Sequence, residues 1–486
     1  MKQIKSNYFF PFLLIAGMIA LTFLQTGCKK TSLLSSGGEV RFSIDTLSFD
    51  TVFTTQGSFT LSLKIYNPQN QKIVLSSVRL EKGAASYFHL NVDGFPGVEV
   101  KDIEIAANDS AFVFATVKIN PDSADLPFII EDKLIATLNG KDFSIPVFAY
   151  GQNAHFIIGE ELNTQTWLTD KPYVVVHSAQ VNPGQTLTIP AGCRVFMHAD
   201  SRLVVYGTLK VNGTLHDSVV FQGDRLDRAY FGYEGYPGEW GGLYFDTASV
   251  NNELHHAILK NGGNNALGAS PALIQVNPDR VADARPQLLL DRVTLQNSIG
   301  YGLLSFGGTV EAYNCLIHTT GAQAMAFIEG GNYKINNCTI VNYGSDKVSH
   351  VDNSAAIVLN YRKVSDNEYI VRDLQASIRN CVVYGSLANE LIIDTLYQSG
   401  LSSNISLVNC LVRAEAAKIP STVNAVNVNY TQDPLFINTV TEKWNFRAKA
   451  GSPLIDTGVD TTGFDLDDNP RLRGAHTDIG AYEEAP

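Results

Sequence analysis

The sequence predicts an all-β protein in two parts, an antiparallel β-sandwich followed by a right-handed parallel β-helix. Two observations predict this. The dipeptide Asn-Cys recurs four times in the second half, each time with Ile or Val two residues after the Cys. A β-rich unit that returns at a short period indicates stacked coils. The first half instead alternates apolar and polar residues in short runs between turn residues, which is typical of antiparallel strands.

Residues 1–27 have the pattern of an export signal. Lys2 and Lys5 form a basic start, and the apolar stretch that follows is too short to span a membrane comfortably. The segment Leu-Gln-Thr-Gly before Cys28 resembles the lipobox of bacterial lipoproteins, which implies acylation at Cys28. Gln25 departs from the usual small or apolar residue, so an ordinary secretory signal is the alternative. Residues 28–38 are polar and predict a flexible tether.

Charge and cysteine content narrow the class of protein. The net charge is −12, and it becomes more negative once Lys2 and Lys5 leave with the signal. This argues against nucleic acid as a partner. Besides Cys28 the chain has five Cys, and an odd number of thiols in an exported protein does not predict a disulfide framework.

Residues 39–150 predict an immunoglobulin-like β-sandwich. Alternating runs include Phe59 to Ile65 and Phe112 to Lys118, and Asn139-Gly140 predicts a hairpin turn before Phe143 to Ile145. About seven short strands without helical periodicity fit such a sandwich. The Cys…Trp…Cys pattern of antibody domains is missing.

Residues 155–430 predict the β-helix. The spacing from Cys315 to Cys338 is 23 residues and that from Cys381 to Cys410 is 29 residues. Residues two apart on a strand share a face, so each Cys faces the core with the Ile or Val that follows. Each Asn then occupies the preceding turn, where it bonds backbone groups or neighbours in adjacent coils. The predicted ladder consists of Asn314, Cys315, Asn337, Cys338, Asn380, Cys381, Asn409 and Cys410.

A metal or redox site is the alternative for these pairs, but zinc sites favour Cys residues two to four apart. Asp291-Arg292 and His255-His256 fit the same slot in earlier coils, and the two His are predicted to face opposite sides. Glu311 and Lys334 each precede a repeat Cys by four residues, as do Ser377 and Ser406. The first two are therefore predicted to stack as a surface ion pair.

Residues 431–486 predict the segment that closes the β-helix. Asp433-Pro-Leu-Phe, Ser452-Pro-Leu-Ile-Asp and Asp478-Ile-Gly-Ala-Tyr-Glu resemble the C-terminal closure of many bacterial β-helix proteins. With these motifs, the mature chain resembles the exported, pectin-lyase-like β-helix lipoproteins of Bacteroidota that carry an N-terminal Ig-like domain. The resemblance implies a fold and an envelope location, and no established activity.

The densest aromatic stretch is the candidate contact for a glycan or partner. It contains Tyr233, Glu234, Tyr236, Glu239 and Trp240. Rings stack on the apolar faces of sugars, and the carboxylates can bond hydroxyls. A loop folded over the solenoid, with Trp240 as its packing anchor, is the structural alternative.

The sequence predicts no cofactor. Asp465, Asp467 and Asn469 have the spacing of the first ligands of a calcium loop, but Pro470 and His476 stand where an EF-hand needs Gly and Glu. A calcium site of another type near this C-terminal segment is the alternative to plain capping turns.

We therefore expect a non-catalytic lipoprotein, anchored by lipid to the outer membrane on a side that the sequence leaves open. Its β-helix would bind a glycan or an envelope protein. No pair of carboxylates suited to glycoside hydrolysis can be nominated, so no catalytic residue is predicted. The alternatives are a polysaccharide lyase or glycoside hydrolase of the β-helix type, and a structural adhesin.

Overall fold

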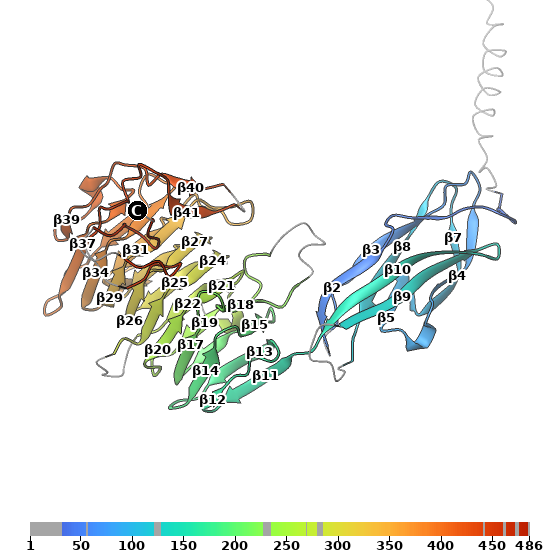
Figure 1. Cartoon of the computed structure of the whole chain (residues 1–486), viewed down its shortest axis with the longest axis horizontal. Helices are drawn as coiled ribbons and strands as arrows, with labels where there is room; N and C mark the ends of the chain where they lie inside the picture. The colour runs from blue at the N-terminus through green and yellow to red at the C-terminus, as the bar shows by residue number, and fades with distance from the viewer. Residues whose placement is uncertain are drawn as a thin grey trace, which may run out of the picture. The chain divides into compact units, whose positions relative to one another are not determined.

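The structure is a computed structural model that describes residues 32–54, 57–120, 128–226, 235–268, 270–278, 285–440, 443–459, 463–471 and 476–484. They form two compact units that divide between Gln152 and Asn153 (Figure 1). The predicted fold class is confirmed, since a β-sandwich, antiparallel except for the parallel pair β2 and β10, precedes a parallel β-helix. Within these residues no helix has the length and apolar character needed to cross a membrane. The predicted signal peptide and Cys28 lie outside the described residues.

The sandwich packs two five-stranded sheets around an apolar core. The predicted turn at Asn139-Gly140 joins β9 and β10, with both residues at positive φ as a type I′ turn requires. The first sheet has the order β1 (Arg41–Phe42), β3 (Leu61–Tyr66), β8 (Ser110–Val117), β5 (Phe88–Val92), β6 (Phe95–Gly97). The second has the order β2 (Leu47–Phe53), β10 (Lys141–Gln152), β9 (Phe128–Leu138), β4 (Ile73–Leu80), β7 (Glu99–Ile105).

Strand β8 buries its small residues and exposes its rings. Ala111, Val113 and Ala115 lie in the core, whereas Phe112 and Phe114 are about two-fifths exposed, at 43% and 40%. Alternation along a strand defines two faces, and the neighbouring sheet decides which of them is buried.

Each coil of the β-helix contributes a strand to each of three parallel ladders, which we name A, B and C. Strands β11 (His155–Leu162) and β13 (Tyr173–Val181) begin ladders B and C. Ladder A contains β12 (Gln165–Thr166), β14 (Thr186–Pro190), β17 (Thr208–Asn212), β20 (Asn252–His255), β23 (Leu288–Asp291), β26 (Thr309–Tyr313), β29 (Gly331–Asn336), β34 (Leu374–Arg379), β37 (Ser403–Val408), β39 (Asn424–Val426).

The other two ladders continue each coil in turn. Ladder B contains β15 (Arg194–Met197), β18 (Val219–Gly223), β21 (Ala257–Lys260), β24 (Thr294–Ser298), β27 (Leu316–Thr320), β30 (Thr339–Asn342), β35 (Val382–Gly385), β38 (Leu411–Val412). Ladder C contains β16 (Leu203–Val205), β19 (Leu243–Phe245), β22 (Ala272–Val276), β25 (Tyr301–Phe306), β28 (Met325–Ile328), β31 (Ala356–Leu359), β36 (Leu391–Asp394). One continuous apolar core lies between the three ladders.

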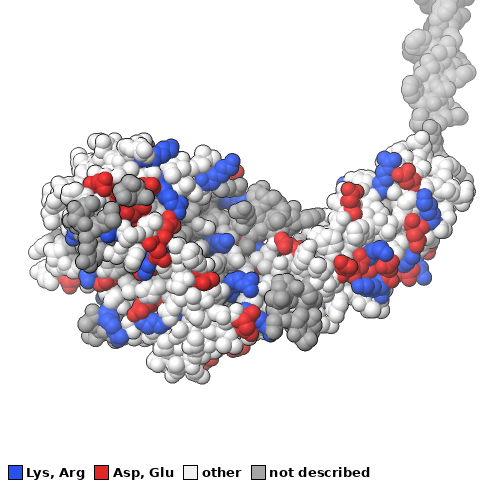
Figure 2. All heavy atoms as spheres, in the orientation of Figure 1, with Lys and Arg blue, Asp and Glu red and all other residues white. Residues whose placement is uncertain are grey.

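Among the described residues, two hairpins of the β-helix unit and three short 3-10 turns lie outside the ladders. The hairpins are β32 (Tyr361–Ser365) with β33 (Glu368–Val371), and β40 (Phe436–Asn438) with β41 (Asn445–Ala448). The 3-10 turns are η1 (Gly83–Ala85), η3 (Ala266–Gly268) and η4 (Ala416–Lys418). On the face shown in Figure 2, side chains of both charge signs are interspersed.

A single left-handed residue forms the bend between ladders A and B in successive coils. We name these residues the turn column. Asn tolerates this conformation better than most residues because its short side chain bonds locally. The turn column consists of His256 (φ 44°), Arg292 (φ 56°), Asn314 (φ 53°), Asn337 (φ 52°), Asn380 (φ 49°), Asn409 (φ 49°) and Asn427 (φ 53°). His256 and Arg292 therefore align with the repeat Asn residues, one position earlier in the repeat than the spacing predicted, because the spacing aligned Arg292 with Cys315.

The four repeat Cys follow the turn column and are buried in the core. The backbone N–H of Cys315 donates to Sγ of Cys338 at 3.5 Å, and that of Cys338 donates to Sγ of Cys381 at 3.4 Å. Burial raises the pKa of the Cys410 thiol to about 12 and that of Cys193 to about 11. Thiols with such pKa values, shielded by the core, are poor nucleophiles and metal ligands.

We expect all five thiols of a soluble form beginning at Ser32 to resist a thiolate-specific reagent in the native state at pH 8. All five should react after unfolding in guanidinium. The variant Asp366→Cys, at an exposed position, is the control and should react at once. Stoichiometric reaction of a native repeat Cys would contradict the burial described above.

Candidate functional site

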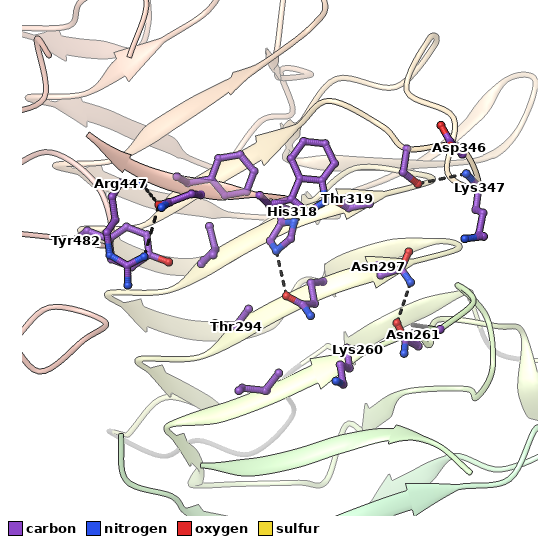
Figure 3. A pocket seen from close by; sticks show the side chains of 18 residues that line it. Lys260, Asn261, Thr294, Asn297, His318, Thr319, Asp346, Lys347, Arg447 and Tyr482 are labelled. Atoms are coloured by element: carbon purple, nitrogen blue, oxygen red, sulfur yellow. Dashed lines mark hydrogen bonds between the residues drawn. The ribbon is translucent and has the colours of Figure 1, made fainter. Parts of the chain in front are cut away.

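A groove of about 530 Å³ lies on the outer face of ladder B (Figure 3). Its floor comes from three adjacent strands, β21, β24 and β27. The parallel register aligns two rows across these strands, so side chains far apart in sequence lie side by side. The first row is Ile258, Thr294, Leu316 and the second is Lys260, Gln296, His318.

His318 is the buried end of the second row. Its Nε2 lies 3.2 Å from Oε1 of Gln296 and its Nδ1 lies 2.9 Å from Oγ1 of Thr319. Burial lowers the pKa of His318 to about 3, so the ring is neutral at pH 7. The neutral tautomer that suits both partners donates from Nε2 to Gln296 and accepts the Thr319 hydroxyl at Nδ1. This pair of bonds fixes the orientation of the Gln296 amide.

One edge of the groove has a strained backbone. Asn261, Asn297 and Thr319 lie at equivalent positions near the ends of the floor strands and have positive φ, and Nδ2 of Asn297 donates to Oδ1 of Asn261 at 2.8 Å. Asn accepts this conformation readily. Thr319 is β-branched, so a φ of 55° costs on the order of 1–3 kcal/mol. Its hydroxyl bond to His318 offsets part of that cost.

The facing wall is aromatic and comes from hairpin β40–β41. The rings of Trp444 and Phe446 are stacked with centroids 5.8 Å apart, and Tyr343 lies 6.4 Å from Trp444. Phe446 also contacts the His318 ring at 5.1 Å. These rings belong to an apolar cluster over ladder B. The hairpin packs over ladder B of the later coils, and the groove lies along its edge.

Arg447 and Tyr482 complete this wall. The Arg447 guanidinium lies 4.5 Å from the Tyr482 ring centroid, and its Nε donates to Oδ2 of Asp467 at 3.0 Å. The charge of Arg447 is thus matched within the wall. Across the groove, the loop with Asp346 and Lys347 forms the rim (Figure 3).

A buried contact between His350 and Glu390 anchors the rim loop. His350 Nε2 lies 3.0 Å from Oε1 of Glu390, and both side chains are almost fully buried. Glu390 also accepts the backbone N–H groups of Leu387 and Ala355. Charge-assisted bonds of this kind hold a loop in place.

The predicted aromatic stretch splits between packing and the groove. Tyr233 and Glu234 lie outside the described residues. Trp240 is fully buried and its Nε1 donates to the carbonyl of Lys260 at 2.9 Å, which makes it a packing anchor. Tyr236 is 40% exposed, and the Lys347 ammonium lies 5.2 Å from its ring centroid. Glu239 accepts the backbone N–H of Tyr236 at 2.7 Å.

The calcium candidates have protein partners. Both oxygens of the Asp465 carboxylate accept backbone or amide N–H groups, including those of Asp467, Asn469 and Glu483. Asp467 binds Arg447. Among the described residues, no group of three or more His, Cys, Asp and Glu is arranged to hold a metal ion. The carboxylates of this loop act as turn and wall contacts here.

The predicted surface ion pair forms as expected. Glu311, Lys334, Ser377 and Ser406 stack in register on ladder A, and Lys334 Nζ donates to Oε1 of Glu311 at 2.7 Å. His255 and His256 have separate partners, Asp291 and Asp468 respectively.

Sequence reasoning missed the groove itself. The floor residues His318, Gln296 and Lys260 each follow the core residue of the repeat slot by three positions. This constant offset could have predicted from the sequence that the three side chains form a row. The place of Trp444 in the groove wall could not be predicted from the repeat, because Trp444 belongs to a hairpin more than a hundred residues further along the chain.

No protein-family model matches the chain, and no curated protein matches it. Three solved structures show partial likeness. A family 123 glycoside hydrolase from Clostridium perfringens is 10% identical over 23% of this chain and 26% of its own length, with a TM-score of 0.18. This chain therefore spans about a quarter of that enzyme.

The other two structures match more of their own length. The ASH/PapD-like domain 7 of human CEP192 is 10% identical over 26% of this chain and 91% of that domain, with a TM-score of 0.17. The catalytic domain of a GH87 α-1,3-glucanase in complex with tetrasaccharides is 11% identical over 85% of this chain and 91% of that domain, with a TM-score of 0.22. TM-scores this low do not establish a common fold or a common function.

Because His318 stays neutral while folded, acid should destabilise the protein through this residue. In the unfolded chain a His has a pKa near 6.5. Below that pH the unfolded state therefore binds a proton at His318, whereas the folded state does not. The free energy of unfolding should therefore fall by about 1 kcal/mol per pH unit from about pH 6 toward the folded pKa. Urea unfolding at pH 7, 6, 5 and 4 measures this.

The variant His318→Gln should lose this part of the acid sensitivity, whereas His216→Gln at an exposed position should keep it. Parallel decline of the wild-type and His318→Gln curves would contradict the assignment.

Proposed function

We propose that this chain is an outer-membrane lipoprotein whose β-helix binds a glycan in the groove on ladder B, without turning it over. The single observation that carries the binding role is the pairing of an aromatic wall with a floor that presents the hydrogen-bonded amide of Gln296 beside Lys260. The lipid anchor at Cys28 and the membrane location rest on the lipobox resemblance. The sandwich would serve as a spacer.

The groove chemistry suits a sugar. A sugar ring has apolar C–H faces and hydroxyl edges, so it needs both rings and groups that donate and accept. Trp444 lines the groove with a half-buried ring that is stacked on Phe446. Gln296 offers an amide held in one orientation by His318. Binding sites generally combine an apolar lining with a few oriented polar groups.

The same lining argues for binding over hydrolysis. Glycoside hydrolysis needs two carboxylates across the bond. Among the described residues that line the groove, Asp346 is the only carboxylate. His318 is bonded at both ring nitrogens and held neutral by burial, which makes it a positioning group for Gln296 and a poor base.

The soluble form beginning at Ser32 should bind at least one family of oligosaccharides on a panel of acidic and neutral glycans. Trp444→Ala and Gln296→Ala should each weaken that binding about tenfold, the loss expected for a well-packed contact. Phe112→Ala removes an exposed ring from the sandwich and should leave the affinity unchanged. Equal affinity of the wild type and all three variants would show that the groove is not the binding site.

A degradation screen on the same polymers, with and without Ca²⁺, tests the non-catalytic part. We expect neither new reducing ends nor unsaturated products. Turnover would replace the binding role with hydrolase or lyase chemistry according to the product. Failure to bind any glycan, together with capture of an envelope protein, would favour the adhesin or scaffold alternative.

A further inference from the structure

The C-terminal segment runs along the turn column and bonds to it coil after coil. We name residues 454–459, 463–471 and 476–484 the strap. Asn409 donates from Nδ2 to the carbonyl of Thr457 at 2.9 Å, and Asn337 donates to that of Asp478 at 3.4 Å. The Asn side chains thus bond backbone groups, as the sequence predicted, and these groups belong to the strap.

Asn380 makes the tightest of these attachments. Its Nδ2 donates to the carbonyl of Val459 at 2.7 Å, and its Oδ1 accepts the Val459 N–H at 2.8 Å. Asn380 thereby pairs with the Val459 peptide groups as a β-strand would. It is fully buried under the strap.

Charged residues extend the contact toward earlier coils. Arg471 donates from Nε and Nη2 to Oδ1 of Asn314 at 3.1 and 3.0 Å, and it also binds Glu483 at 2.7 Å. Asp468 lies 2.5 Å from Arg292 and 3.2 Å from His256. Six successive members of the turn column, from His256 to Asn409, therefore touch the strap.

The strap is continuous with the wall of the groove. Tyr482 belongs to both, and Asp467 of the strap holds the Arg447 guanidinium against the Tyr482 ring. Ile479 and Leu466 join the apolar cluster that packs Trp444 and Phe446 over ladder B. A displacement of the strap would thus move the residues that face the floor.

We infer that the turn column is a fastening for the strap, and that Asn380 and Asn314 are positioning residues for the wall of the groove. The last coil offers a contrast. Asn427 has the same left-handed conformation in the last turn, yet it is exposed. The amide of a turn-column Asn therefore has a second role, besides favouring the turn, wherever the strap covers it.

The inference rests on the proposed function only for its consequence in ligand binding, so its test needs no ligand. Hydrogen–deuterium exchange would be measured on the soluble protein beginning at Ser32 and on Asn380→Gly. Gly keeps the left-handed turn and removes the amide. The Val459 amide should exchange about fivefold to tenfold faster, the factor that corresponds to one lost hydrogen bond.

Peptides that contain Arg447 and Tyr482 should also exchange faster in Asn380→Gly, by about twofold or more, since opening spreads through contiguous packed units. A second variant, Gly458→Ala, should act in the same direction. A Cβ there would lie 2.7 Å from the Thr477 carbonyl and 3.1 Å from Oδ1 of Asn380. The control Asn427→Gly should change neither region.

Two results would overturn the inference. Unchanged exchange at Val459 in Asn380→Gly would show that the column does not fasten the strap. Faster exchange at Val459 with an unchanged wall would show that the strap does not position the groove. Absence of glycan binding by the wild-type protein would instead remove the proposed function, and the exchange result would stand by itself.

Discussion

The structure depends on one bend, the single left-handed residue that turns the chain from ladder A to ladder B. From β20 onward this bend recurs in each coil, and the strands on either side of it pair in register with those of the next coil. Asn314, Asn337 and Asn380 adopt it with φ values within a few degrees of one another. This bend sets the register of the Cys residues stacked in the core, and it also sets the register of the groove floor on the outer face.

Left-handed Asn residues at this bend and at the end of the ladder B strands bond different partners. A buried amide must find partners, and at Asn380 those partners are peptide groups of the strap. At the groove edge, Asn297 and Asn261 satisfy each other instead. Thr319 occupies the equivalent place in the next coil at the cost of strain, and its hydroxyl holds the neutral His318. Thr thus replaces Asn at this second bend in the coil that contains His318.

Some predictions from sequence held because they rested on local periodicity. Glu311 and Lys334 pair across adjacent coils since both precede the repeat Cys by the same number of residues. Other readings needed the packed structure. Trp240 had two interpretations that differ only in burial, and its ring proved to be fully covered. The Asp465 loop has ligand-like spacing, but its carboxylate accepts N–H groups from its own turn and from Glu483.

The sequence by itself determined the two-part architecture, the coil repeat, the bend residues and the inward placement of the Cys. These follow from side-chain alternation and from backbone preferences that act within a few residues. Only the tertiary structure decided which surface becomes a groove and what the Asn side chains bind. Arg471 reaches Asn314 across 157 residues of sequence, and Asn337 reaches Asp478 across 141. Bonds between such distant residues leave no periodic pattern in the sequence. They depend on the position of the C-terminal segment, which has no repeat of its own.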